Sequence, residues 1–243
     1  MSEPVTPYHT KASKKEEVRN MFDNIAGRYD LLNRVLSLRI DVYWRNKAVA
    51  FLKPFKPAHI LDVACGTGDF SIAALKTGAQ KVTGVDISEK MLAAGRVKMK
   101  ERGLDGKIAL ETGDSEQLQY ATATFDAATV AFGVRNFEQL DKGLAEMQRV
   151  LKPGAPIVIL EFSKPRVFPV KQLYHFYFST ILPLIGRLVS GDARAYTYLF
   201  ESVSAFPDGN DFLDHMNKAG FTSCAAKRLT FGICSMYTGL KKD

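Results

Sequence analysis

Short apolar runs alternate with segments of helical periodicity through the middle of the chain. Each run is too short for a helix, and apolar positions recur every three or four residues in the segments between the runs. The runs predict strands at residues 60–63, 82–85, 107–111, 125–131 and 157–162. The segments predict helices at residues 70–77, 89–102 and 140–150. This alternation predicts a doubly wound, parallel α/β sheet with right-handed crossovers.

The first 57 residues precede this alternation and have a different pattern. Residues 1–12 are polar, and we expect a disordered tail there. Ser13 followed by Glu16 is typical of a capping box, and apolar positions at helical spacing follow it. We therefore expect an N-terminal helical lid at residues 13–57, before a main domain at residues 58–243.

The last part of the chain departs from the alternation a second time. Residues 164–207 form an aromatic-rich insertion, and residues 181–185 add aliphatic surface to it. We interpret the insertion as the wall of an apolar substrate pocket, because ligands of such sheets bind at the carboxyl ends of the strands. A packed helical cap and a homodimer interface are the alternatives. Residues 223–229 and 233–238 predict a hairpin that closes the sheet.

Composition narrows the setting in which the protein works. The chain has 243 residues, 46% of them hydrophobic, which is enough for one large α/β domain with an addition. Its three cysteines lack metal-ligand or redox spacing, so we expect a cytoplasmic protein without a metal. We also expect neither a signal peptide nor a membrane span, because the chain begins with a polar stretch and lacks a long apolar run.

The net charge of +7 is concentrated in the two additions to the sheet. Residues 1–57 hold 11 basic against 6 acidic side chains, and residues 164–207 hold 5 against 2. A basic surface attracts phosphate groups, either those of nucleic acid or those of anionic lipid. A solvated surface without a partner is the alternative.

A glycine-containing loop follows the first predicted strand. Residues 60–69 read ILDVACGTGD, and Gly66 and Gly68 would let a ligand approach the backbone closely. The second predicted strand ends in Asp86, 18 residues after Gly68. An acid at this point of a doubly wound sheet can accept hydrogen bonds from ribose hydroxyls. The sequence therefore predicts a nucleotide-like ligand.

The charges around this loop favour S-adenosylmethionine (SAM) over a dinucleotide. Ser71 stands where the dinucleotide fingerprint would have its third glycine. Asp62 before the loop and Asp69 after it would repel a pyrophosphate but suit a ligand with an amino group and a sulfonium. For Asp69, helix capping is the alternative role. Asp114 and Ser115, after the third strand, are candidates for reading the adenine edge, with a simple turn as the alternative.

The segment after the fourth strand should contact the methyl acceptor. It reads AFGVRN over residues 131–136, without the prolines that base-modifying methyltransferases carry there, so we do not expect a nucleic-acid substrate. Arg135 places a cation beside the site of transfer, where it and Asn136 can hold a phenolate or orient a water. A salt bridge from Arg135 to a surface acid is the alternative.

Over residues 15–240 the chain resembles the ubiquinone/menaquinone biosynthesis C-methyltransferase family. The family's motifs match segments spread along the whole chain, including the glycine loop and the segment after the fourth strand. The matching segments are Tyr29–Asn33, Asp62–Asp69, Phe132–Asn136, Arg149–Gly154 and Leu160–Pro165. The resemblance implies a class I SAM-dependent methyltransferase with a Rossmann-like doubly wound sheet.

The resemblance also implies a reaction and a set of site residues. The reaction would be methyl transfer from SAM to a ring carbon of a polyprenylated hydroquinone, and we read the substrate as demethylmenaquinol. Methylation of the 2-methoxy-6-polyprenyl-benzoquinol precursor of ubiquinone, or of both quinols, is the alternative. The implied SAM-binding positions, besides Asp62 and the loop glycines Gly66 and Gly68, are Thr67, Asp86, Asp114 and Ser115. Arg135, Asn136 and Tyr29 would lie near the quinol.

Two departures from the family pattern bear on this interpretation. Asp41 stands where the family commonly has histidine, and Ala131 stands where ubiquinone-type members often have serine. The second departure favours the naphthoquinol. Because a prenyl tail stays in lipid, we expect peripheral contact with a membrane through the basic N-terminal segment or the insertion. The rival functions are an RNA or small-molecule methyltransferase and a non-catalytic SAM-binding partner.

Overall fold

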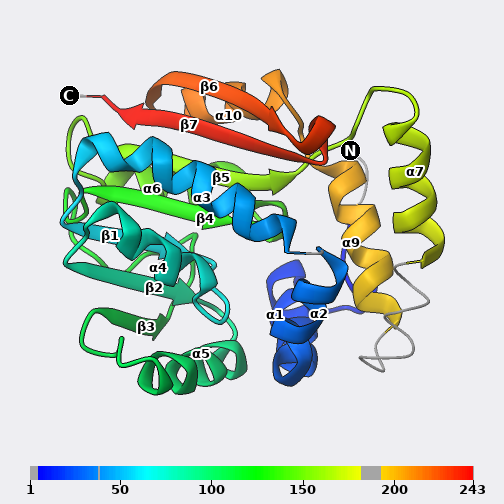
Figure 1. The fold of residues 1–243 in the computed structure, drawn as a ribbon, viewed down its shortest axis with the longest axis horizontal. Coiled ribbons are helices and arrows are strands. Elements are labelled where there is room, and N and C mark those ends of the chain that lie inside the picture. The colour runs from blue at the N-terminus through cyan, green and yellow to red at the C-terminus, as the bar shows by residue number, and fades with distance from the viewer. Residues whose placement is uncertain (1–4, 38, 182–192, 243) are drawn as a thin grey trace.

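The computed structural model of the chain describes residues 5–37, 39–181 and 193–242. Its centre is a seven-stranded sheet with the strand order β3-β2-β1-β4-β5-β7-β6 (Figure 1). The strands are β1 (His59–Val63), β2 (Lys81–Asp86), β3 (Ile108–Thr112), β4 (Ala127–Ala131), β5 (Pro156–Phe162), β6 (Phe221–Leu229) and β7 (Cys234–Lys241). β1 to β5 are parallel, and β7 pairs antiparallel with both β5 and β6. The predicted doubly wound sheet and closing hairpin are therefore confirmed.

Helices cover both faces of the sheet (Figure 1). One face packs against α3 (Ile40–Leu52), α4 (Asp69–Ala74) and α5 (Glu89–Glu101). The other face packs against α6 (Leu140–Val150) and α10 (Asn210–Lys218). Short 3-10 turns follow two of these helices, η2 (Lys53–Phe55) after α3 and η3 (Leu75–Thr77) after α4.

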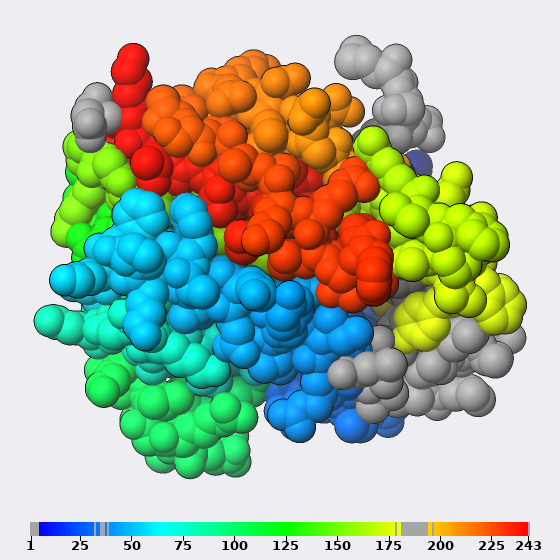
Figure 2. All heavy atoms as spheres, turned by 45° about the horizontal axis from the view of Figure 1, so that its top comes forward, coloured from blue at the N-terminus to red at the C-terminus, as the bar shows by residue number. Residues whose placement is uncertain are grey.

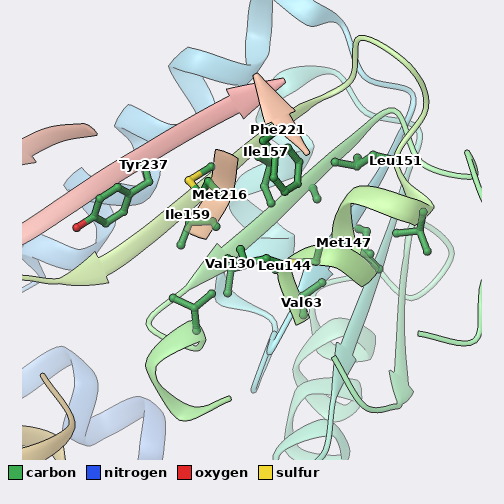
Figure 3. Close-up of a cluster of buried hydrophobic side chains, with 14 of the residues drawn as sticks. Val63, Val130, Leu144, Met147, Leu151, Ile157, Ile159, Met216, Phe221 and Tyr237 are labelled. Carbon is green, nitrogen blue, oxygen red and sulfur yellow. The ribbon is translucent and has the colours of Figure 1, made fainter. Parts of the chain in front are cut away.

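The alternation of side chains along each strand builds two separate cores. Ile157 and Ile159 of β5 belong to the core under α6 and α10, which Figure 3 shows in close-up. Val158 and Leu160 belong to the core on the opposite face. Because both faces of β5 are buried, its sequence is a nearly continuous apolar run. This run is what predicted a strand here from the sequence.

The edge of the sheet where the parallel strands end is covered by segments from both ends of the chain (Figure 1). These are α1 (Lys14–Ile25), η1 (Ala26–Arg28), α2 (Tyr29–Leu36) and α9 (Ala193–Ala205), with α7 (Val170–Phe176) and the π-helical η5 (Tyr177–Ile181) farther out. Val18, Met21 and Ile25 of α1 pack against Ala195 and Tyr198 of α9. Helices α1 and α9 thus belong to one cover over the carboxyl ends of the strands, while α3 of the expected lid packs on a face of the sheet.

The N-terminal segment begins its ordered contacts earlier than expected. The Ser13 cap is confirmed, because its hydroxyl accepts the N–H of Glu16 at 3.2 Å. Residues 5–12, which we expected to belong to a disordered tail, are held by the buried Glu17, whose carboxylate accepts the N–H groups of Tyr8 and Thr10 at 2.6 Å each. The aliphatic segment expected at 181–185 lies outside the described residues from 182 onward.

Candidate active site

The loop between β1 and α4 needs glycine for reasons that the structure makes explicit. Gly66 and Gly68 have φ angles of +56° and +81°, in the left-handed region that side chains disfavour. A Cβ on Gly66 would lie 3.2 Å from the Met91 methyl group, and one on Gly68 would lie 2.6 Å from the Met99 methyl group. Of the two glycines, Gly66 lines the hollow described next.

A narrow hollow of about 60 Å³ lies at the carboxyl ends of β1 and β2. Gly66, Asp86, Asp114 and Ser115 all line it, so four of the predicted SAM-binding residues lie together. Asp86 holds the loop in place, because Oδ2 accepts the Gly66 N–H at 2.8 Å and Oδ1 accepts the Ser88 N–H at 2.9 Å. Burial raises the pKa of Asp86, and these backbone amides oppose the rise. The backbone N–H of Ile87 is a third donor to this carboxylate, which has about four acceptor sites, so about one site remains for a ligand.

Two neighbouring lysines of helix α1 contact residues around this hollow. The Lys15 ammonium is 2.6 Å from an Asp114 oxygen and 3.0 Å from a Glu116 oxygen. The Lys14 ammonium donates to the carbonyl oxygens of Arg135 and Phe137 at 3.0 and 2.9 Å. The sequence did not reveal either contact, and Lys15 already occupies one oxygen of the predicted adenine-reading carboxylate.

A larger hollow of about 450 Å³ adjoins the narrow one. The two share the side chains of Phe22, Tyr29 and Phe132 as a common wall. Most of its surface is apolar and comes from α1, α3, β5, α7 and α9. Its apolar lining includes Met21, Ile25, Trp44, Phe162, Leu173, Tyr177, Leu199 and Ile233. Residues of the insertion line this hollow, as the pocket interpretation expects.

Arg135 lies on the wall of the larger hollow, on the 3-10 turn η4 (Val134–Asn136). Its Nη1 donates to Glu161 Oε1 at 2.8 Å and to the carbonyl oxygen of Phe132. Its Nε is buried and has no hydrogen-bond partner in the part of the chain that the structure describes. Arg135 thus forms an ion pair with a fully buried acid, not with a surface acid.

Glu161 is a functional candidate that our sequence reasoning missed. Its carboxylate also accepts the backbone N–H of Arg135 at 3.3 Å and that of Phe162 at 2.9 Å. Burial raises its pKa, and Arg135 opposes the rise. A signal was present in the sequence, because an acid inside an apolar strand needs a buried partner.

Tyr29 and Asn136 occupy different positions around the two hollows. Tyr29 lines both, and burial raises the pKa of its phenol, so the hydroxyl keeps its proton at neutral pH. Asn136 lines only the narrow hollow, and its Oδ1 accepts from the Tyr198 hydroxyl at 3.1 Å. Tyr198 in turn lines the larger hollow, so Asn136 reaches that space through Tyr198.

Asp69, which we read as suiting a cationic ligand, is held by two cations of the protein itself. Its Oδ1 is 2.9 Å from the Lys98 ammonium, and its Oδ2 is 3.6 Å from Arg45. Burial works in the opposite direction, yet Lys98 holds the pKa of Asp69 below its ordinary value. Thr67 is engaged in the same network, since its hydroxyl donates to Asp30 at 2.6 Å and accepts from Lys98 at 2.9 Å.

Asp62 lies beneath the loop, where it lines the larger hollow and accepts hydrogen bonds from Ser71 at 2.6 Å and Thr129 at 2.8 Å. Burial raises its pKa from 3.8 to about 6. At a pH between these two values, Asp62 is protonated in the folded state and ionised in the unfolded state. The free energy of unfolding therefore falls as the pH rises through this window. When the pH is raised from about 5 to about 7.5, we expect the ionisation of Asp62 to lower the free energy of unfolding by about 1 kcal/mol.

Urea denaturation of the protein and of Asp62→Asn at both pH values measures this contribution. The variant should lose that part of the pH dependence, whatever its absolute stability. Identical pH dependence of the two proteins would show that Asp62 titrates normally in the fold.

A parallel sheet with one antiparallel strand inserted near its edge, a glycine loop after β1 and an acid ending β2 together define a class I SAM-dependent methyltransferase. Solved structures share this fold. A SAM-dependent methyltransferase of Thermotoga maritima, a possible histamine N-methyltransferase, matches with a TM-score of 0.66 at 19% identity, over 92% of this chain and 99% of that one. Within this class, the chain belongs to the ubiE/COQ5 methyltransferase family, whose model matches residues 10–241.

Curated relatives match the chain over almost its whole length. A demethylmenaquinone methyltransferase of Bacteroides fragilis is 49% identical over 240 residues, which are 98% of each chain. A protein of the same name from Porphyromonas gingivalis is 45% identical over 241 residues, again 98% of each chain. A ubiquinone/menaquinone biosynthesis C-methyltransferase UbiE of Geotalea daltonii is 46% identical over 230 residues, covering 94% of this chain and 97% of the relative.

Proposed function

We propose that this enzyme transfers the methyl group of SAM to a ring carbon of demethylmenaquinol, giving menaquinol. The observation that carries the proposal is the Arg135 guanidinium, paired with Glu161 on the wall of an apolar hollow large enough for a quinol ring. The names of the relatives from B. fragilis and P. gingivalis support the naphthoquinol as substrate. The ubiquinone precursor remains the alternative acceptor, and the relative from G. daltonii carries a name that covers both quinones.

The narrow hollow is the proposed site of the nucleoside part of SAM. The residues there fit this group, because the loop backbone is kept bare at Gly66 and the Asp86 carboxylate retains an acceptor site for a ribose hydroxyl. Asp114 and Ser115 would contact the adenine, while Asp62, Thr67 and Gly68 would support the methionine side from within the loop. When bound, SAM supplies an electrophilic methyl group on a sulfonium.

The larger hollow is the proposed site of the quinol, and its residues would activate the ring. A hydroquinone carbon is a poor nucleophile until the adjacent phenol, with a pKa near 10, loses its proton. The positive Arg135 guanidinium on the wall of this hollow can stabilise the resulting phenolate, and this attraction is strong because the surroundings are apolar. Arginine stays charged and Tyr29 keeps its proton, so we assign the proton to a water. Tyr29 and the Asn136–Tyr198 pair would orient the ring between the two hollows.

We further propose that the enzyme acts in the cytoplasm at the membrane surface, where the prenyl tail of the quinol remains in lipid. Within the described residues, none of the helices has both the length and the apolar character to cross a bilayer.

The acceptor segment lacks the prolines of base-modifying enzymes, which supports a substrate other than nucleic acid. A homodimer through the insertion would use the same exposed side chains as membrane contact.

Incubation of the pure protein with methyl-labelled SAM tests the proposed reaction. The acceptors are reduced demethylmenaquinol, the demethylated ubiquinone precursor and, as a third sample, purified RNA. We expect label in the naphthoquinol, and label in both quinols would identify a dual-purpose enzyme. Label in RNA alone, or SAM binding without any transfer, would contradict the proposal.

A further inference from the structure

We propose that residues 164–176 and the tip of the β6–β7 hairpin form a single docking face for an anionic lipid bilayer, with the mouth of the larger hollow inside it. We call this surface the docking face. The inference rests on the proposed function, because it supplies the route by which a prenylated quinol would reach Arg135. It also selects the insertion over the basic N-terminal segment as the membrane contact.

Large apolar side chains are exposed on the docking face. Phe168 is 78% exposed and Phe231 is 76% exposed, and Val167 and Phe176 are also exposed. Exposing apolar area to water is unfavourable in proportion to that area. Several exposed apolar side chains on one surface therefore indicate an interaction site.

The hairpin tip and the insertion lie side by side although about 60 residues separate them in the sequence. The tip is the 3-10 turn η6 (Thr230–Gly232), and the carbonyl oxygen of Gly232 accepts from the Ser163 hydroxyl at 2.8 Å. A Cβ built on Gly232 would lie 3.6 Å from the Cα of Pro165. Figure 2 shows the orange-red tip next to the yellow-green segment that contains α7.

The backbone of the tip holds Phe231 in an unfavourable conformation. Thr230 and Phe231 have φ angles of +47° and +56°, a region that costs energy for residues other than glycine. Trp44 Nε1 donates to the Thr230 hydroxyl at 2.7 Å and ties the tip to α3. Leu229 and Gly232 on either side are buried, while Phe231 stands out into solvent. Strain that persists in this way, and that exposes an aromatic ring, points to a role outside the folded core.

The charges of the docking face match a surface of phosphate groups. Between Glu161 and Asp192 the sequence contains no acidic residue, while Lys164, Arg166 and Lys171 are basic. Arg166 and Lys171 are exposed and form no ion pair with another residue that the structure describes. In a symmetric dimer through this face, the two patches would bring like charges together. The charges therefore favour an anionic bilayer over a second copy of the chain.

The docking face is continuous with the larger hollow. Val170 and Leu173 of α7 line the hollow, and Leu173 is also 64% exposed. A residue that is both lining and exposed marks the mouth of a hollow. A quinol ring could therefore enter from the bilayer while its tail stays among the lipid chains.

The first test removes the exposed aromatic side chains. The combined variant Phe168→Ser, Phe176→Ser, Phe231→Ser is compared with the unchanged protein by co-sedimentation with vesicles of phosphatidylcholine and phosphatidylglycerol. We expect binding to fall at least about tenfold, because each ring contributes apolar area to insertion. Val97→Ser is the matched control, since Val97 on α5 is also exposed, at 58%, but lies outside the docking face.

The second test removes the charges. Arg166→Gln with Lys171→Gln should weaken binding to the anionic vesicles about 25-fold, at about fivefold for each charge. Binding of the unchanged protein should fall with salt and be weak on pure phosphatidylcholine. Equal vesicle binding by all variants would overturn the inference. A dimer that the aromatic substitutions dissociate, with vesicle binding unchanged, would assign the face to a second copy instead.

Methyl transfer to a demethylated naphthoquinol without a prenyl tail separates the two proposals. The docking variants should methylate this acceptor in solution at the unchanged rate, because none of the altered residues lines either hollow. Failure of the unchanged protein to methylate it, with vesicle binding intact, would contradict the proposed function and leave the docking face standing.

Discussion

Replacement of Arg135 by lysine is expected to lower kcat about 100- to 1000-fold while the affinity for SAM changes less than about threefold. Lysine keeps a positive charge beside Glu161, but it lacks the planar guanidinium and therefore the fixed fork of N–H donors that Arg135 brings to the wall of the hollow. The loss should fall on the step in which the phenolate develops, and not on binding of the methyl donor. Single-turnover methylation of the quinol and calorimetric titration of SAM measure the two quantities.

Lysine is preferable to alanine at this position because of the buried partner. Alanine would leave the Glu161 carboxylate without a counter-charge, at a cost of about 3–5 kcal/mol in stability. Arg149→Lys is the matched control, since Arg149 pairs with Glu146 at 2.7 Å and lines neither hollow. Turnover of Arg135→Lys within about threefold of the unchanged enzyme would remove Arg135 from the mechanism.

Replacement of Asp86 by asparagine is expected to weaken SAM binding about 10- to 100-fold. Hydrogen bonds to a charged acceptor contribute about 1.5–3 kcal/mol each, and asparagine loses the charge and one of the two acceptor oxygens. The Gly66 N–H would also compete with the ligand for the single oxygen that remains. Calorimetric titration with SAM, or with its demethylated product, gives the dissociation constant.

Asp126→Asn is the matched control for this change. Asp126 Oδ2 also accepts two backbone N–H groups, those of Ala58 at 3.1 Å and His59 at 2.7 Å, but it lines neither hollow. This control should bind SAM as the unchanged protein does. If Asp86→Asn also bound SAM with unchanged affinity, Asp86 would serve only to hold the loop.

The fold was predictable because its signals are local. The apolar run of β5 identifies a strand buried on both faces. Asp86 ends β2 at the edge of the sheet where ligands of such folds bind. The family to which the chain belongs was predictable from the motif segments spread along the chain. The roles of individual site residues remain predictions, although Asp86, Asp114 and Ser115 line one hollow, and Arg135 and Tyr29 line its neighbour.

The charge partners were not predictable because they join segments that are distant in the sequence. Asp69 was read as an acid that suits a cationic ligand or caps a helix, and its pairing with Lys98 of α5, at 2.9 Å, was not foreseen. For Arg135, a salt bridge to a surface acid was the alternative role, but its partner Glu161 is buried in β5. Spacing along a chain fixes which residues share an element, while side-chain pairing depends on how the elements pack.

The neighbouring lysines of α1 have a consequence for how the two substrates influence each other. Lys15 contacts Asp114 beside the proposed SAM site, and Lys14 contacts the carbonyl oxygens of Arg135 and Phe137 beside the proposed quinol site. A displacement of this first helical turn therefore alters both contacts at once. By thermodynamic linkage, a donor that shifts the turn changes the affinity for the acceptor, and the acceptor changes the affinity for the donor by the same factor. If the two proposed sites are right, one turn of helix couples the binding of two chemically unrelated molecules.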